Sequence, residues 1–190
     1  MNKAKSKSIH RNNYKEIRNK VLPDVEELII EEVGKTINKL LSGNKSKSCI
    51  GIYWPLTGEV DLRSLKVKFN LQMALPASKP GGEITYHRWL DRPLKRDSCG
   101  IPAPLDEPKL RPEEISLLLV PGIAIDERGY RLGYGGGFFD RLRAKNNWRS
   151  IPAIVVLPKA CFSDDPLPKD PWDIPFNGWI NEDGYFRSHN

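Results

Sequence analysis

The sequence predicts a three-layer α/β fold of the Rossmann-like kind, with a mostly parallel central sheet flanked by helices. Two short apolar runs, 116–120 and 151–157, are typical of strands that are buried on both faces. Segments with helical spacing of apolar residues alternate with the strand-like runs, and this alternation favours parallel strands joined by helices.

The elements of this pattern can be placed in order along the chain. An amphipathic helix is expected over 24–41, where apolar residues recur at helical spacing behind Pro23 and Asp24. Strands are expected where short apolar or alternating runs are bounded by proline or glycine, at 48–54, 70–75, 83–90, 116–120 and 151–157. Shorter helices are expected at 61–68 and 138–145, and a last short strand near 179–180. We therefore expect a single α/β domain over residues 21–190.

Basic residues are concentrated at the start of the chain. Of the 30 Lys and Arg and the 24 Asp and Glu, residues 1–20 hold seven basic residues and one acidic residue. Residues 21–190 therefore hold 23 of each, and the body of the protein is neutral. We expect residues 1–20 to form a basic, mobile arm, with the alternative that part of it holds an anionic ligand. The neutral body argues against a nucleic-acid partner.

The remaining composition indicates a cytoplasmic protein. No apolar run approaches the roughly 18 to 20 residues that span a bilayer, so no membrane partner is expected. No hydrophobic signal core follows the basic N-terminus. Cys49, Cys99 and Cys161 are scattered without a CxxC pair, which favours free thiols in a reducing compartment and argues against a zinc site. We also expect a monomer.

The segment RLGYGGGFFDR at 131–141 has four glycines within five residues, directly before the expected helix at 138–145. Glycines allow backbone N–H groups to approach a phosphate without interference from a Cβ atom. Arg131 could neutralise phosphate oxygens, and Asp140 could hold the magnesium ion that accompanies a nucleotide. The spacing matches neither GxxxxGK[ST] nor GxGxxG, so a flexible turn remains the alternative.

A second segment, YWPLTGEVD at 53–61, places aromatic residues at the end of an expected strand and carboxylates just beyond it. Ligands of open α/β sheets bind at the carboxyl ends of the strands. Trp54 suits a flat heterocycle there, and Glu59 suits the N–H donors of such a ring. Core packing is the alternative for Tyr53 and Trp54.

These two segments, in this order, resemble the 5-formyltetrahydrofolate cyclo-ligase family, also called methenyltetrahydrofolate synthetase. VPGIAID at 120–126 matches a third segment of that family, and the resemblance covers roughly residues 50–182. The chain is identified as a divergent member. The resemblance implies that MgATP drives the conversion of 5-formyltetrahydrofolate to 5,10-methenyltetrahydrofolate, with release of ADP and phosphate.

The resemblance also implies roles for individual residues. Arg131 and Asp140 would be catalytic, and magnesium would be held by Asp140 and Asn177. ATP would be bound by Arg11, Lys15, Arg131, Leu132, Gly133, Tyr134, Gly135, Gly136, Gly137, Phe138 and Phe139. The reduced folate would be bound by Trp54, Glu59, Tyr134, Gly135, Gly136, Gly137 and Phe138. Lys15 with Arg18 offers a second register for the N-terminal ATP-binding segment.

Three positions depart from the family pattern. Ala103 replaces a glutamate, Trp172 replaces a histidine, and Asn177 replaces an aspartate. A glutamine usual in the family is also missing near Cys161 and Phe162. Two alternatives therefore stay open: a family member that cyclises another substrate, and a folate- or nucleotide-binding protein without turnover.

Overall fold

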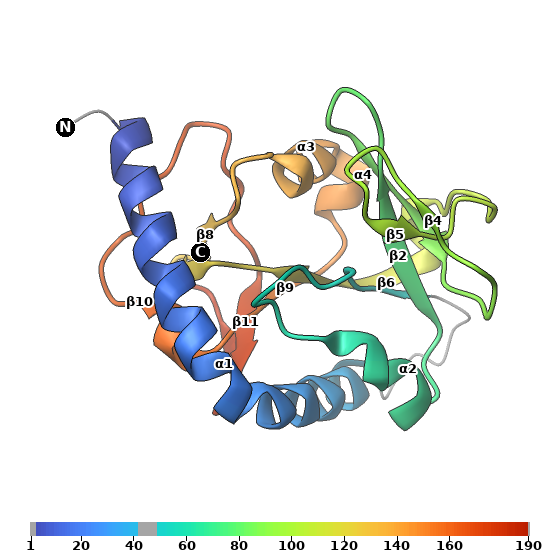
Figure 1. Ribbon diagram of the computed structural model, residues 1–190, viewed down its shortest axis with the longest axis horizontal. Coiled ribbons are helices and arrows are strands. Elements are labelled where there is room, and N and C mark those ends of the chain that lie inside the picture. Colours follow the sequence, from blue (N-terminus) through green and yellow to red (C-terminus); the bar gives the residue numbers. More distant parts are fainter. Residues whose placement is uncertain (1–2, 42–48, 190) are drawn as a thin grey trace.

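A seven-stranded sheet forms the middle of the molecule (Figure 1). The structure, a computed structural model, describes residues 3–41 and 49–189, so Ser48 of the first expected strand lies outside the described residues. In the order across the sheet, the strands are β12 (Gly184–Arg187), β11 (Gly178–Asn181), β9 (Ala153–Val156), β6 (Ile115–Pro121), β1 (Cys49–Gly51), β2 (Met73–Ser78) and β3 (Ile84–Arg88). Neighbours from β11 to β2 run parallel, and β12 and β3 are antiparallel edge strands. The expected mostly parallel sheet is confirmed.

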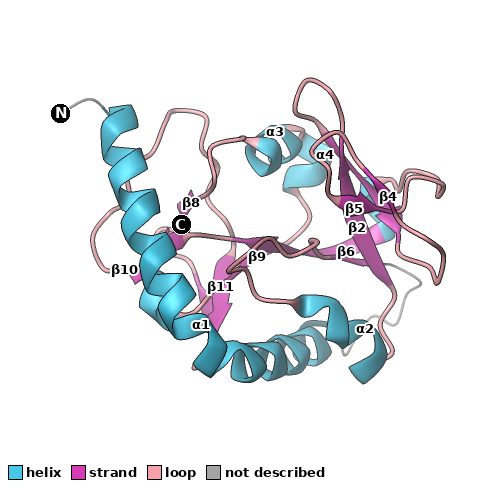
Figure 2. Ribbon diagram, in the orientation of Figure 1, coloured by secondary structure: helices cyan, strands magenta, loops and turns pink. Residues whose placement is uncertain are grey.

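Helices cover both faces of this sheet (Figure 2). The helices are α1 (Lys3–Leu41), α2 (Leu65–Lys68), α3 (Phe138–Ala144) and α4 (Asn146–Arg149). Leu117 and Leu119 of β6 pack into the core that contains α1 and α2, whereas Leu118 and Val120 pack into the core that contains α3 and α4. Because successive strand residues point to opposite faces, a strand covered on both faces must be apolar throughout.

The N-terminal helix is much longer than the helix predicted over 24–41. The expected start at residue 24 is wrong: α1 begins at Lys3 and contains Pro23. Figure 1 shows α1 changing direction partway along, as proline does when it removes a backbone hydrogen bond inside a helix. Residues 3–20 are therefore helical rather than a separate arm, and the guanidinium of Arg18 is buried, with 2% of the residue exposed. Residues 1 and 2 of the expected arm lie outside the described part.

Strand β2 also differs from its expected bounds, because it continues through Pro76 to Ser78. The pairing of β2 with β1 ends at Ala74, so the missing N–H of Pro76 leaves no strand partner unsatisfied on that side. On the other side Pro76 lies opposite Tyr86 of the edge strand β3. The expected helix at 61–68 is a 3-10 turn, η1 (Leu62–Ser64), followed by α2.

Several short elements complete the fold. A three-stranded sheet is formed by β10 (Phe162–Ser163), β7 (Ala124–Asp126) and β8 (Arg131–Leu132), and a two-stranded one by β4 (Lys95–Arg96) and β5 (Pro102–Ala103). Two further 3-10 turns are η2 (Pro112–Glu114) and η3 (Lys159–Cys161). Within the described ranges, no helix combines the length and the apolar composition that a bilayer crossing requires.

Candidate active site

One large cavity lies at the carboxyl ends of the parallel strands. Its volume is about 420 Å³, which is within the range of small-molecule sites. Tyr53 and Trp54 reach it from the end of β1, Ser78 from the end of β2, and Pro121 from the end of β6. The N-terminal half of α1 contributes to the same wall. The kink at Pro23 matters here, because it allows one helix to cover the sheet with one half and to line the cavity with the other.

The glycine segment forms part of the wall, as its composition predicts. Gly135 and Gly137 have positive φ values of 100° and 64°, which side chains with a Cβ rarely adopt. Gly136 does not have a positive φ, and its constraint is steric: a Cβ there would lie 2.7 Å from the ring of Phe138. Arg141 stabilises the loop by donating to the carbonyl oxygens of Gly82 and Gly136. The segment is therefore a fixed, hydrogen-bonded loop.

Arg131 is a buried cation in the cavity wall. Its side chain is 7% exposed, it donates to the carbonyl oxygen of Pro121 at 2.9 Å, and its Nη2 lies 3.9 Å from Asp140. Burial lowers the pKa of Arg131 from its usual value, while Asp140, Glu59 and Asp173 act in the opposite direction. Its Nε is buried without a hydrogen-bond partner among the described residues. An arginine held in this way offers positive charge to an anion in the cavity.

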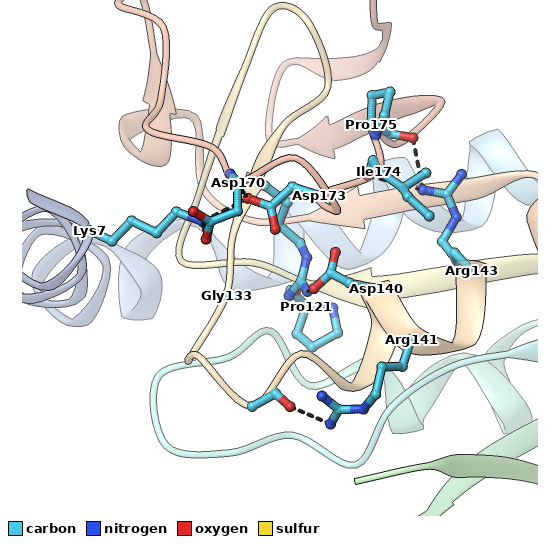
Figure 3. Close-up of polar contacts among 12 residues, drawn as sticks. Lys7, Pro121, Gly133, Asp140, Arg141, Arg143, Asp170, Asp173, Ile174 and Pro175 are labelled. Carbon is cyan, nitrogen blue, oxygen red and sulfur yellow. Dashed lines mark hydrogen bonds and ion pairs between the residues drawn. The ribbon is translucent and has the colours of Figure 1, made fainter. Parts of the chain in front are cut away.

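Lys7 and its partners Asp170 and Asp173 line the cavity but were not predicted as site residues from the sequence. The ammonium of Lys7 donates to Asp170 and to Asp173, each at 2.7 Å, and its side chain is 12% exposed (Figure 3). Burial would lower the pKa of Lys7, but the hydrogen bonds and charges of the two carboxylates raise it above its usual value.

The spacing of Lys7 and Arg11 is compatible with this placement, but Arg11 and Lys15 have the same spacing, so the sequence alone does not select Lys7 over Lys15. Residues four apart lie on one helix face, so a helix through residue 7 places both cations on the same side. Arg11 lines the cavity and donates from Nε to the carbonyl oxygen of Gly133 at 2.8 Å. Lys15 does not line the cavity; its ammonium lies over the ring of Tyr134, 4.9 Å from the centroid. Helix α1 therefore presents Lys7 and Arg11 to the cavity, in place of the expected Arg11 and Lys15.

The other end of the cavity combines aromatic rings with a buried carboxylate. Trp54 and Glu59 both line it, and Glu59 Oε2 accepts a hydrogen bond from the backbone of Leu56 at 2.8 Å. Glu59 Oε1 is buried and has no hydrogen-bond partner among the described residues. Burial raises the pKa of Glu59, opposed by the Leu56 N–H group and the charge of Arg18.

Arg18 of α1 is a buried residue that contacts the residues at this end of the cavity. Its guanidinium donates to the hydroxyl of Tyr134 at 2.6 Å and to the carbonyl oxygen of Gly122 at 3.1 Å. Tyr134 itself lines the cavity. One buried arginine from the expected arm therefore ties α1 to the glycine segment and to the end of β6.

The structure brings most of the predicted site residues together. Those that line the cavity are Arg11, Trp54, Glu59, Arg131, Leu132, Gly133, Tyr134, Gly135, Gly136, Gly137, Phe138, Phe139 and Asp140. Asn177 does not line it. Its side-chain oxygen accepts a hydrogen bond from the backbone of Ala153, the first residue of β9, whereas the cavity lies at the opposite, carboxyl ends of the strands. Ala103 is buried in β5.

Carboxylates suited to a metal ion are nevertheless present in the cavity. Asp140 and Asp173 both line it, and the negative charge of each raises the pKa of Arg131. Among the described residues, no group of three or more His, Cys, Asp or Glu is arranged to hold a metal ion. Magnesium commonly takes one or two carboxylates and completes its shell with substrate phosphates and water. The donor set therefore fits magnesium bound together with a polyphosphate.

Comparisons with known proteins identify the family of this chain. The sequence profile of the 5-formyltetrahydrofolate cyclo-ligase family matches residues 3–181. A 5-formyltetrahydrofolate cyclo-ligase of Haemophilus influenzae is 33% identical over 139 residues, which cover 66% of this chain and 71% of that protein. The chain belongs to the 5-formyltetrahydrofolate cyclo-ligase family.

Solved structures give the same picture of the fold. The 5,10-methenyltetrahydrofolate synthetase of Aquifex aeolicus has a TM-score of 0.79 and 29% identity, with 97% of this chain and 93% of that chain covered. The corresponding enzyme of Mycoplasma pneumoniae has a TM-score of 0.69 at 19% identity, with 93% and 98% covered. The second likeness supports the fold alone.

Proposed function

We propose that this protein converts 5-formyltetrahydrofolate to 5,10-methenyltetrahydrofolate, using ATP and magnesium and releasing ADP and phosphate. The observation that carries the proposal is the two-ended cavity. The charges of Glu59 and of Asp173 both act on Arg131, which therefore lies between two ends of the cavity. Trp54 and Glu59 line one end, and Lys7, which is paired with Asp173, lines the other together with Arg11. Such a cavity can hold a flat heterocycle and a polyphosphate in contact.

The reaction requires a poor leaving group to be converted into a good one. Transfer of the γ-phosphoryl group of ATP to the formyl oxygen gives an iminium phosphate and ADP. Attack by N10 of the same folate on the formyl carbon closes the ring. N10 then loses its proton to solvent, and phosphate leaves with the former formyl oxygen. The protein must position the two substrates and stabilise negative charge, and it needs no covalent intermediate of its own.

The residues of the cationic end are suited to that task. Arg131 presents a desolvated guanidinium, whose charge acts more strongly on a transferring phosphoryl group than it would in water. The backbone N–H groups of the glycine segment would hold the β- and γ-phosphates. Lys7 would exchange its carboxylate partners for phosphate oxygens. In this proposal Asp140 and Asp173 are then available to magnesium, which neutralises charge on the phosphates.

The residues of the aromatic end are suited to the reduced pterin. Trp54 offers an indole ring to pack against it, and the unpartnered Glu59 Oε1 offers an acceptor for its ring N–H donors. A buried carboxylate oxygen without a partner is costly in the free protein, and a ligand that donates to it removes that cost.

The test is an assay of purified protein with MgATP and 5-formyltetrahydrofolate, following the near-ultraviolet absorbance of the methenyl product and the release of ADP. We expect product formation that needs ATP and magnesium together. ADP release only with another substrate would identify a divergent cyclase. Binding of ATP or folate without ADP or product would identify a binding protein.

A further inference from the structure

Trp172 differs from the other four tryptophans of the chain. Trp54, Trp89, Trp148 and Trp179 each have an aromatic or cationic partner for their rings. Trp172 has no ring partner within residues 3–41 and 49–189, is 69% exposed and lines the cavity. An indole ring left in water at the edge of a cavity costs hydrophobic stabilisation, so its position requires an explanation other than core packing.

Hydrogen bonds fix the backbone position from which the Trp172 side chain extends. Asp170 to Asp173 form a tight turn, in which the N–H of Asp173 donates to the carbonyl oxygen of Asp170 at 3.1 Å. Pro171 occupies the second position, where its fixed φ favours the turn. The carboxylate of Asp173 accepts from the N–H of Asp170 at 2.8 Å and closes the turn from its other side. Lys7 binds both carboxylates.

The segments on either side of this turn are anchored as well. On one side, the buried carboxylate of Asp126 accepts from the N–H of Leu167 at 3.0 Å. On the other side, the guanidinium of Arg143 in α3 donates to the carbonyl oxygen of Pro175 at 2.8 Å (Figure 3). Trp172 is thus an exposed ring on a braced turn. Because this backbone is already fixed, only the side chain has to be ordered when the ring binds a ligand.

We infer that Trp172 is a stacking platform for the purine base of the nucleotide. This inference rests on the proposed function, which assigns the phosphates to Lys7, Arg11 and the glycine segment. Trp172 belongs to the same turn as both partners of Lys7, so it flanks the cationic end of the cavity. Trp54 and Glu59 line the other end, which is assigned to the pterin. A base that extends beyond the phosphates at Lys7 meets the face of Trp172.

Stacking also accounts for the kind of side chain found here. An aromatic ring binds any base through its π-face and needs no hydrogen-bonding partner. The cationic end offers charge for phosphates, whereas Trp172 offers an apolar surface of the right size for a purine. Trp172 would therefore determine the affinity for a purine nucleotide relative to polyphosphate alone, without selecting one purine over another.

The experiment compares ATP with inorganic tripolyphosphate, which carries the phosphates without the base. Dissociation constants are measured by calorimetry in magnesium, without folate, for the wild-type chain, Trp172→Ala and Trp172→Phe. We expect Trp172→Ala to weaken ATP about tenfold and to leave tripolyphosphate within about twofold of wild type. Trp172→Phe keeps a stacking face and should retain most of the ATP affinity. Because the side chain is exposed, both variants should unfold at the wild-type temperature.

The possible outcomes separate this inference from the proposed function. Unchanged ATP affinity in Trp172→Ala would overturn the inference while leaving the proposed function in place. An equal loss for ATP and tripolyphosphate would also overturn it, because the residue would then act on the phosphate site. If ATP affinity is unchanged, a separate titration with 5-formyltetrahydrofolate that shows weakened binding to Trp172→Ala would assign the ring to the folate instead. No binding of either phosphate probe to the wild-type chain would refute the proposed function and this inference together.

Discussion

Replacing Lys7 by methionine tests the cationic end of the cavity most directly. Methionine keeps much of the length of the side chain and removes its charge. A hydrogen bond from an ammonium to a phosphate oxygen contributes about 1.5 to 3 kcal/mol, which corresponds to about 10- to 150-fold in affinity. Lys7 must leave Asp170 and Asp173 to make this bond, so part of the gain is offset. We therefore expect the KM for ATP to rise about tenfold, which is the lower end of that range.

The same substitution should also reduce stability by a small amount. The two ion pairs of Lys7 are neither fully exposed nor fully buried, since the side chains of Lys7, Asp170 and Asp173 are 12%, 28% and 20% exposed. Loss of such pairs costs about 1 kcal/mol, or about 2 to 4 °C in Tm for a chain of this size. Thermal unfolding followed by circular dichroism would measure it.

Lys15→Met is the matched control, because Lys15 is on the same helix but does not line the cavity. Its contact with the ring of Tyr134 is a cation–π interaction of about 0.5 kcal/mol at an exposed site, so the KM for ATP should stay within about threefold. Steady-state kinetics with varied ATP at saturating 5-formyltetrahydrofolate distinguish the two. A large effect of Lys15→Met together with a normal KM in Lys7→Met would refute the assignment and restore the register expected from the sequence.

Three further predictions concern the carboxylates. Glu59→Gln should raise the KM for folate about tenfold and leave the KM for ATP unchanged. Because burial raises the pKa of Glu59, folate binding to the wild-type protein should weaken as the pH falls through that raised pKa. The Glu59→Gln variant should lack this pH dependence. Asp140→Asn should raise the magnesium requirement, whereas Asn177→Asp should leave it unaltered, and a magnesium titration of both checks this.

The third concerns Asp97, whose carboxylate accepts from the N–H groups of Ser78, Cys99 and Ile101 in a loop at the cavity. Burial opposes its ionisation, but these donors lower its pKa below the usual value. A carboxylate whose pKa is lower in the folded state than in the unfolded state stabilises the protein at pH values above its unfolded-state pKa. This stabilisation is lost as the pH falls through its folded-state pKa. Asp97→Asn should thus destabilise the protein at pH 7 by about 1 to 3 kcal/mol and reduce the acid dependence of Tm. Equal Tm values at pH 7 would contradict this.

Much of the architecture follows from local patterns in the sequence. The continuous apolar run of β6 requires cover on both faces, and the glycine segment 133–137 indicates backbone conformations that other residues rarely adopt. These features depend on side-chain polarity and on φ, both of which are properties of short segments. The mostly parallel sheet, the glycine loop in the cavity wall and the placement of Trp54 and Glu59 beyond the end of a strand were predictable for this reason, whereas the order of the strands was not.

The cationic end of the site was decided by tertiary structure alone. In the sequence, Pro23 is equally consistent with the start of a helix and with a kink inside one. Packing of Arg18 against the glycine segment and the end of β6 selects the kink, and only then does the first half of α1 bring Lys7 and Arg11 to the cavity.

The position of Asn177 was decided in the same way. The family resemblance implied that Asn177 is a metal ligand, but its hydrogen bond to Ala153 places it at the amino end of β9. Asp173, four residues earlier, lines the cavity instead. The sequence by itself determined the residue types of the site, because those depend on local chemistry. Which carboxylate faces the cavity depends on contacts between segments more than 100 residues apart, such as that between Lys7 and Asp173, with a separation of 166. Only the folded chain specifies those contacts.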